Sequence, residues 1–263
     1  MIKPEKELER VLPGEGSFVT VAPIYDELMD GVPYESWVVY LQTLLDRREA
    51  KPKRILDLAC GTGNVTELLH NLGYEMTGVD IAPGMIESAR QKATQKSLPI
   101  TYAVQDAAEL NLPQRDFDLC VSLFDSLNYI LEPKRLDAAI HNVAQHLKSG
   151  ALFIFDMNSE YALKHNFFRQ DNIGSRDRLR YDWDSTFEDA TRLCRVRMKF
   201  WYREDNGVDR AFEEIHYQFA YREDEVRKML TAAGFGTVET FQAYTLRSPA
   251  RNADRIFYVA QKQ

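Results

Sequence analysis

Two hydrophobic patterns alternate along the first 157 residues of the chain. Short apolar runs, typical of buried strands, are followed by stretches in which apolar residues recur every three or four positions, typical of helices that cover a sheet. Strands are predicted at 53–59, 74–80, 99–106, 117–125 and 150–158. Because short connections join strands and helices in turn, the pattern predicts a parallel sheet with helices on both faces. Right-handed crossovers make such a sheet doubly wound.

The helix predicted after the first strand shows its pattern most clearly. Its apolar residues fall at i, i+3, i+4 and i+7, at Val65, Leu68, Leu69 and Leu72. Asn64 is the expected N-cap of this helix, and Gly73 is its expected stop. Further helices are predicted at 37–45, 83–94, 133–147 and 226–233.

The period changes from that of helices to that of strands after residue 160. Residues 176–221 alternate between two faces, with Val196, Met198 and Phe200 on the apolar one. Antiparallel strands are predicted at 178–187, 191–203 and 210–221, and closing strands at 236–244 and 255–262.

The predicted fold class is therefore α/β. We expect a doubly wound, mostly parallel seven-stranded sheet of Rossmann-like form, with a small antiparallel β insertion. The core is assigned to residues 1–160 and 222–263 and includes N-terminal lid helices. The inserted subdomain is assigned to residues 161–221.

Composition narrows the class of protein. The chain has 263 residues and a net charge of -7, which disfavours a protein that binds nucleic acid by neutralising phosphates. The N-terminus has no apolar signal-peptide core, and no apolar run is long enough to span a membrane, so we expect a cytoplasmic protein without a membrane partner. Three separated cysteines without a CxxC pair argue against a zinc site, and we expect no metal.

Candidate chemistry lies where the predicted strands end. Residues 55–64 read ILDLACGTGN, with Gly61 and Gly63 in a Gly-x-Gly turn. The dinucleotide fingerprint needs a third glycine or alanine, but Thr66 stands there, and the chain has no P-loop motif. The turn instead fits a wider D-x-A-x-G-x-G frame that begins at Asp57, and the next two strands end in Asp80 and Asp106.

This set of residues resembles the class I S-adenosylmethionine-dependent methyltransferases, over roughly residues 20–160 and more loosely over the last helix and strand pair. The resemblance implies that the glycine turn holds the methionine end of the cofactor, that Asp80 takes the ribose hydroxyls, and that Asp106 reads the adenine amine. It also implies S-adenosyl-L-homocysteine as the product. The expected cofactor contacts are Tyr25, Asp57, Ala59, Gly61, Gly63, Asn64, Asp80, Ile81, Met85, Asp106, Ala107, Phe124 and Asp125.

Physical arguments support these roles independently. Glycine has no Cβ, so backbone at a glycine turn can approach a ligand closely. A carboxylate can accept hydrogen bonds from two vicinal hydroxyls, and the cofactor has no phosphate that would require a third glycine. Its sulfonium and ammonium groups are cationic, which agrees with the acids around the site.

The methyl acceptor is less closely defined. The loop at 124–129 reads FDSLNY and lacks the [DN]-P-P-[YF] motif of enzymes that methylate DNA bases or glutamine amides. The chain is more similar to small-molecule methyltransferases, including sugar-amine N-methyltransferases, whose inserts roof the acceptor pocket. Expected acceptor contacts are Tyr34, Trp37, Asn128, Tyr129, Asn158, Tyr161 and His165. No catalytic triad is evident, and the candidates for direct catalysis are Tyr25, Asn128 and His165.

The sequence thus predicts transfer of a methyl group to nitrogen or oxygen of a small polar metabolite by in-line displacement, in a monomer or homodimer. Two alternatives remain open. One is an RNA methyltransferase acting on tRNA, and the other is a non-catalytic module that binds S-adenosylmethionine. A dehydrogenase is disfavoured by Thr66. The nine arginines between Arg176 and Arg222, with Lys199, are matched by ten acids, so the insert does not indicate an anionic substrate.

Overall fold

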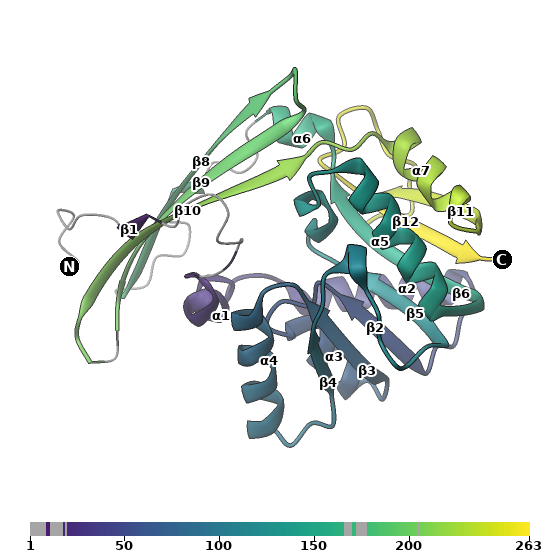
Figure 1. Cartoon of the computed structure of the whole chain (residues 1–263), viewed down its shortest axis with the longest axis horizontal. Helices are drawn as coiled ribbons and strands as arrows, with labels where there is room; N and C mark the ends of the chain where they lie inside the picture. The colour runs from purple at the N-terminus through teal and green to yellow at the C-terminus, as the bar shows by residue number, and fades with distance from the viewer. Residues whose placement is uncertain (1–8, 11–17, 19, 166–169, 172–177, 205) are drawn as a thin grey trace.

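Two β-sheets organise the chain (Figure 1). The computed structural model describes residues 9–10, 18, 20–165, 170–171, 178–204 and 206–263. The larger sheet has seven strands, in the order β11 (Phe235–Gln242), β12 (Arg255–Lys262), β6 (Leu147–Asn158), β5 (Phe117–Ser122), β2 (Arg54–Leu58), β3 (Glu75–Asp80) and β4 (Thr101–Val104).

The pairing confirms the predicted doubly wound sheet. Strands β2 to β6 pair in parallel, and β12 runs antiparallel to both of its neighbours. From β2 the chain winds outward through β3 to β4, and it then crosses back to β5 on the other side of β2. The order therefore reverses between β2 and β5, which is where a doubly wound sheet leaves room for a ligand.

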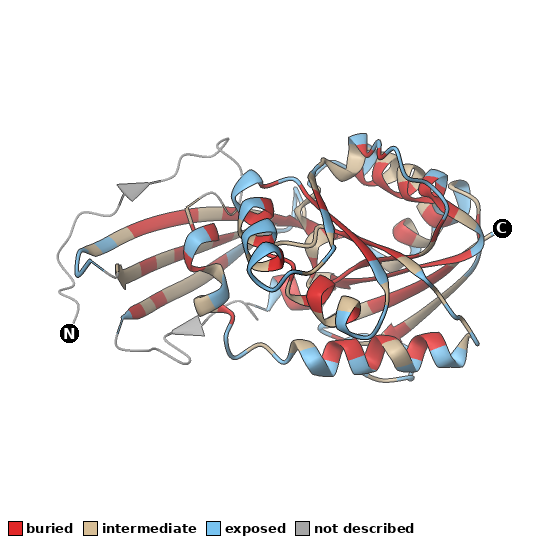
Figure 2. Cartoon of the chain, turned by 90° about the horizontal axis from the view of Figure 1, so that it is seen from below, coloured by how far each residue is buried: buried red, intermediate tan, exposed pale blue. Residues whose placement is uncertain are grey.

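Helices cover both faces of this sheet. On one face, α2 (Tyr34–Arg47) and α3 (Asn64–Asn71) pack against the sheet in a shared apolar cluster. On the other face lie α5 (Pro133–His146) and α7 (Glu223–Ala232), while α4 (Pro83–Gln95) packs against β4. Figure 2 shows the buried positions running through the sheet and along the inner sides of the helices.

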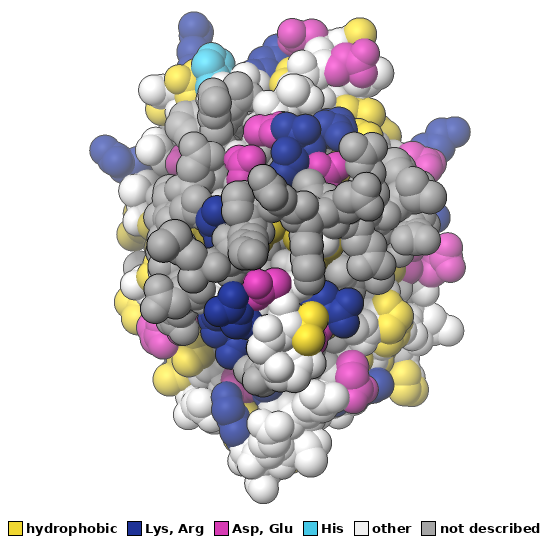
Figure 3. Space-filling model, turned by 90° about the vertical axis from the view of Figure 1, so that its left-hand side faces the viewer, with side chains coloured by type: hydrophobic (Ala, Val, Ile, Leu, Met, Phe, Trp, Pro, Cys, Tyr) yellow, Lys and Arg dark blue, Asp and Glu magenta, His cyan; other side chains and the backbone are white. Residues whose placement is uncertain are grey.

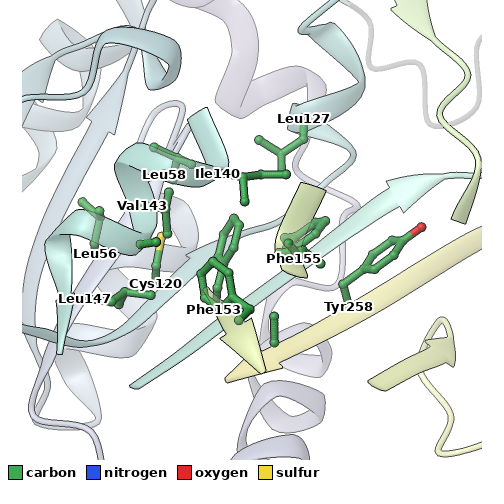
Figure 4. Close-up of a cluster of buried hydrophobic side chains, with 14 of the residues drawn as sticks. Leu56, Leu58, Cys120, Leu127, Ile140, Val143, Leu147, Phe153, Phe155 and Tyr258 are labelled. Carbon is green, nitrogen blue, oxygen red and sulfur yellow. The ribbon is translucent and has the colours of Figure 1, made fainter. Parts of the chain in front are cut away.

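The core on the α5 side is built from alternate residues of the strands. Leu56 and Leu58 of β2 and Phe153 and Phe155 of β6 meet Ile140 of α5 (Figure 4). Burial of this apolar surface is the dominant favourable contribution to folding. The alternation leaves Asp57, between two of these leucines, on the opposite face and at the carboxyl end of β2.

The start of α3 differs from the prediction. Asn64 is the first residue of the helix, and Gly63 occupies the N-cap position with a φ of 82°. The Asn64 side chain makes long-range contacts instead, donating to Asp26 and accepting from Lys92. The helix ends at Asn71, so Leu72 is exposed and does not extend the apolar stripe.

The long strands of the smaller sheet lie within residues 161–221, the predicted insertion. Its long strands β8 (Leu179–Glu188), β9 (Leu193–Arg203) and β10 (Asp209–Phe219) pair antiparallel, which confirms the three strands expected there. The short strands β7 (Gln170–Asp171) and β1 (Glu9–Arg10) lie at its edges, beside β8 and β10 respectively. This sheet extends away from the seven-stranded one (Figure 1).

One face of the smaller sheet is apolar and packs toward the larger domain. Val196, Met198 and Phe200 form a cluster with residues of η1 (Ala22–Ile24) and with Met85 of α4. Basic and acidic side chains are interspersed on the side of the molecule seen in Figure 3, in agreement with the balanced charge of the insert. Across the described ranges, no helix is both long and apolar enough to cross a lipid bilayer.

Candidate active site

The turn after β2 has the backbone shape that its sequence requires. Ala59, Gly61 and Gly63 all take positive φ values, of 59°, 54° and 82°. The two glycines serve different purposes. A Cβ on Gly61 would meet no atom within 4 Å, whereas one on Gly63 would overlap the hydroxyl of Tyr102. Gly61 therefore faces open space, and Gly63 allows β4 and the start of α3 to pack closely.

Asp80 joins this turn to the end of β3. Its Oδ2 accepts the N–H of Gly61 at 2.8 Å, and its Oδ1 accepts the N–H of Ala82 at 2.8 Å. A carboxylate offers about four lone-pair positions, so each oxygen can accept a second hydrogen bond from a ligand. Burial raises the pKa of Asp80, against the opposing effect of these backbone donors.

Asp57 lies deeper in the site and is 3% exposed. Thr66 donates its hydroxyl to Oδ2 of Asp57 at 2.5 Å. Burial raises the pKa of Asp57 to about 7, and the charge of Asp80 adds to the shift. Thr66, which departs from the dinucleotide fingerprint, is thus the residue that orients the first acid of the turn.

The loop after β5 is held in a strained shape by buried ionic contacts. Phe124 and Asp125 have φ values of 70° and 51°, which non-glycine residues rarely adopt. Asp156 accepts the backbone N–H of both residues, at 2.7 and 3.0 Å. Arg255 pairs with Asp156 and, at 2.6 Å, with Asp125. These contacts fix the loop at the edge of the site.

A cavity of about 820 Å³ lies between these loops and the smaller sheet. Its size is within the usual range for a small-molecule site. The turn after β2, the end of β3 and the loop after β5 form one side. Trp183 of β8 and Val196 and Met198 of β9 line it from the inserted sheet.

Many of the predicted site residues line this cavity. The expected cofactor contacts among them are Tyr25, Asp57, Ala59, Gly61, Asn64, Asp80, Ile81, Met85, Phe124 and Asp125, and the expected acceptor contacts are Tyr34, Trp37 and Tyr129. Burial raises the pKa of Tyr25 well above its ordinary value, so this phenol is neutral.

Three predicted cofactor residues lie outside the lining. Gly63 packs on Tyr102, as described above. Asp106 caps η2 (Ala107–Glu109) by accepting the N–H of Ala108 at 2.8 Å, and its other oxygen pairs with Arg135 at 2.6 Å. Ala107 lies in that short helix, and its carbonyl accepts from Asn142.

Asn128 and Asn158 are structural side chains. The amide of Asn128 donates to the carbonyls of Asn158 and Phe219 and accepts the N–H of Asn158. Asn158 in turn donates to Gln218 at 3.0 Å. Asn128 is fully buried, and its three contacts connect η3 (Ser126–Tyr129) with β6 and β10. The hydrogen-bonding groups of the Asn128 side chain are used in these contacts, away from the cavity lining.

His165 and Tyr161 are also placed away from the cavity. His165 is exposed at the end of α6 (Glu160–Lys164), where its Nδ1 lies 2.7 Å from the carbonyl oxygen of Tyr161. The two rings stack with centroids 4.1 Å apart. Neither side chain is among the residues that line the cavity.

Sequence reasoning missed residues that only long-range contacts bring to the site. Asp26 of α1 (Tyr25–Leu28) accepts from Thr62 at 2.6 Å and pairs with Lys92 at 2.8 Å, which ties α1 to the glycine turn. Glu214 and His216 of β10 form a buried pair behind the cavity. The alternation of side chains along β10 could have placed Glu214 and His216 on the inner face of the insert. It could not have identified the residues that they contact.

Comparisons with known proteins agree with this geometry. Residues 55–150 match a family model described as a methyltransferase domain. A protein of Geobacillus sp. (strain WCH70) with a provisional methyltransferase name is 33% identical over 242 residues, which cover 90% of this chain and 96% of the relative. The chain belongs to the S-adenosylmethionine-dependent methyltransferases. An S-adenosylmethionine-dependent methyltransferase from Clostridium acetobutylicum shares its structure with a TM-score of 0.80 at 31% identity, covering 92% of this chain and 98% of that one.

The fold of this methyltransferase recurs in more distant proteins. The sugar N-methyltransferase KedS8 from Streptoalloteichus is 20% identical and superposes with a TM-score of 0.72 over 100% of this chain and 99% of that chain. At that identity the likeness concerns the fold alone. Membership in the methyltransferase family confirms the cofactor class and the enzymatic activity predicted from the glycine turn, and it does not favour a dehydrogenase.

Proposed function

We propose that this methyltransferase binds S-adenosylmethionine along the ends of β2 and β3 and methylates a nitrogen or oxygen of a small polar metabolite held beneath the inserted sheet. The observation that carries the proposal is the position of the cavity. Its lining comes from the glycine turn and Asp80 on one side and from Trp183 and Met198 of the insert on the other. Residues 161–221 would then roof the acceptor.

The residues present fit the cofactor. Open space above Gly61 lets the methionine part approach the backbone. The two oxygens of Asp80 have acceptor capacity left for the ribose hydroxyls. Ile81 lines the cavity although it is 63% exposed, and a flat apolar group such as adenine would cover it. Asp57 would be stabilised as a carboxylate by the cationic methionine end.

When bound, the cofactor supplies an electrophilic methyl group on a cationic sulfur. The work left to the chain is to orient the acceptor and to exclude water. Aromatic rings of Tyr25, Tyr34, Trp37 and Phe124 line the cavity, and such rings attract cations. Tyr25 is held by Phe18, whose ring lies edge-on to it at 6.0 Å. We propose that Asp106 and Ala107 contact adenine only from the edge of the cavity, because the carboxylate of Asp106 is already paired with Arg135.

Two observations support a small acceptor. The cavity is lined both by the insert and by Phe18 and Val21, so an acceptor bound there would be contacted from two sides. The chain is acidic, with a net charge of -7.

The proposal predicts the destination of a labelled methyl group. The protein is incubated with S-adenosylmethionine labelled in its methyl group and with a cell extract separated into a metabolite filtrate, total RNA and protein. We expect label to enter a product of the filtrate. Label in RNA would support the tRNA alternative instead, and binding of the cofactor without any labelled product would support a non-catalytic module.

A further inference from the structure

Glu214 and His216 form a buried hydrogen-bonded pair inside the inserted sheet. They lie two residues apart on β10, and both side chains are about 1% exposed. His216 Nε2 is 2.8 Å from Oε2 of Glu214. In the register of the sheet, Glu214 is opposite Met198 and His216 is opposite Val196, and those two residues line the cavity. Burying such a pair is costly unless every polar atom is satisfied.

The carboxylate of Glu214 is surrounded by N–H donors. It accepts the backbone N–H of Phe18 at 3.2 Å, of Thr20 at 2.6 Å and of Val21 at 2.9 Å. Among the described residues, each oxygen of Glu214 accepts two hydrogen bonds when the one from His216 is included. We therefore assign the imidazole proton to Nε2, which leaves Nδ1 of His216 with a free lone pair.

Tyr129 connects this lone pair to the cavity. Its hydroxyl lies 3.3 Å from Nδ1 of His216, and its side chain lines the cavity. Phe18 packs against both rings, with centroids 5.3 Å from Tyr129 and 4.6 Å from His216. The hydrogen-bonded path thus runs from the cavity through Oη of Tyr129 to His216, and it ends at the carboxylate of Glu214.

We propose that Tyr129, His216 and Glu214 form a proton relay that removes the proton from the reacting oxygen or nitrogen of the methyl acceptor. This inference rests on the proposed function. As the acceptor atom bonds the methyl carbon and the carbon–sulfur bond of the cofactor breaks, the acceptor loses its proton to Oη of Tyr129. Tyr129 passes its own proton to Nδ1 of His216, and the resulting imidazolium pairs with Glu214. After the product leaves, the proton returns through Tyr129 to water.

The surroundings of Tyr129 suit a shuttle. Burial raises the pKa of its phenol, and the charges of Asp125 and Glu214 raise it further. Tyr129 therefore stays protonated and can accept a proton only by giving up its own. Asp125, Tyr25 and Cys194 are the other titratable groups that face it, and the charge of Asp125 is largely balanced by Arg255. His216 is the group in this set that is placed to take the proton, because its Nδ1 lies 3.3 Å from the hydroxyl of Tyr129.

The first test is spectroscopic and needs no acceptor. The chain has five histidines, so ¹⁵N-labelled histidine gives a short list of resonances, and His216→Phe identifies the one of interest. We expect His216 to be the Nε2–H tautomer at high pH, and we expect its Nδ1 resonance to move in Tyr129→Phe but not in Tyr221→Phe. Tyr221 is a matched control because its hydroxyl donates to Ile130, outside the cavity lining. An Nδ1–H tautomer would overturn the relay, because no lone pair would then face Tyr129.

The second test measures transfer. With labelled cofactor and the metabolite filtrate, Tyr129→Phe should lower the initial rate about 100-fold or more, the usual contribution of general acid–base catalysis. Binding of S-adenosylhomocysteine should stay within about threefold of the wild type. The pH–rate profile of the variant should differ from that of the wild type, because Tyr129→Phe removes the hydroxyl that connects the cavity to His216.

The outcomes separate the two proposals. A Tyr129→Phe variant with a rate close to that of Tyr221→Phe and an unchanged pH profile would refute the relay, even if transfer is confirmed. If the wild-type protein neither binds S-adenosylhomocysteine nor transfers label, the proposed function is wrong, and the relay, which depends on it, is overturned as well. The tautomer of His216 then still shows whether the hydrogen-bond path itself exists.

Discussion

Asp57 shows how strongly the surroundings of a single side chain control its chemistry. It sits between buried leucines on β2, and Thr66 is the residue that donates a side-chain hydrogen bond to it. Burial raises its pKa to about 7, so the native protein holds a proton there that the unfolded chain has released above about pH 4. A cationic ligand would favour release of this proton, because it stabilises the carboxylate.

This shift predicts a pH dependence of stability. Between about pH 4 and pH 7 the native state binds more protons at Asp57 than the unfolded state does. The free energy of unfolding should therefore fall as pH rises through this window, by at most about 1.4 kcal/mol per pH unit. Asp57→Asn removes the titration while its carbonyl can still accept from Thr66.

Urea unfolding at pH 5 and pH 7.5 checks this expectation. Relative to the wild type, the Asp57→Asn variant should be more stable at the higher pH than at the lower one. An equal pH dependence of the two proteins would show that Asp57 is ionised in the native state throughout.

At the scale of elements, Gly63 sets how closely α3 approaches β4. It is the N-cap of α3 with a φ of 82°, and the hydroxyl of Tyr102 in β4 occupies the space that a Cβ would need. The glycine turn therefore has two separable duties. Gly61 leaves space open toward the cavity, and Gly63 serves the packing of the two elements.

Gly63→Ala should consequently be a stability variant. We expect a loss of about 2–4 kcal/mol in the free energy of unfolding, from backbone strain together with the overlap with Tyr102. Adding Tyr102→Phe removes the hydroxyl and should restore about 1 kcal/mol of the lost free energy of unfolding. Gly150→Ala is the matched control, because Gly150 has a φ of 79° and no atom within 4 Å of its Cβ position, so only the strain remains. Equal losses in Gly63→Ala and Gly150→Ala, measured by urea unfolding, would contradict the packing role.

The sequence could predict elements because their signals are local. The alternation of apolar residues gave β8, β9 and β10 to within about two residues, and the helical period gave α5 and α7. The start of α3 was misjudged because Asn64 has the chemistry of an N-cap, while the left-handed backbone that the turn requires belongs to Gly63. The long-range partners of Asp106 and Glu214 lie 29 and 193–196 residues away along the chain, and no local pattern encodes them.

At the scale of the whole molecule, the cavity depends on three parts of the chain that are distant in sequence. The strand ends of the larger sheet supply acids and the glycine turn, the insert supplies Trp183, Val196 and Met198, and the segment at Phe18 and Val21 is held by Glu214. The family and the cofactor class could be predicted from residues 55–106, where the motif is contiguous. The lining of the acceptor side could not, because it forms only when the insert packs against the core.

The central claim is that Asp80 and the turn after β2 hold S-adenosylmethionine, and calorimetry with S-adenosylhomocysteine tests it most directly. The wild type and His165→Ala should bind it with dissociation constants within about threefold of each other. Asp80→Asn should weaken binding at least about tenfold, or about 1.4 kcal/mol, in a variant that circular dichroism shows to be folded. NAD should give no binding heat. Failure of the wild type to bind S-adenosylhomocysteine, or equal losses in Asp80→Asn and His165→Ala, would contradict the account.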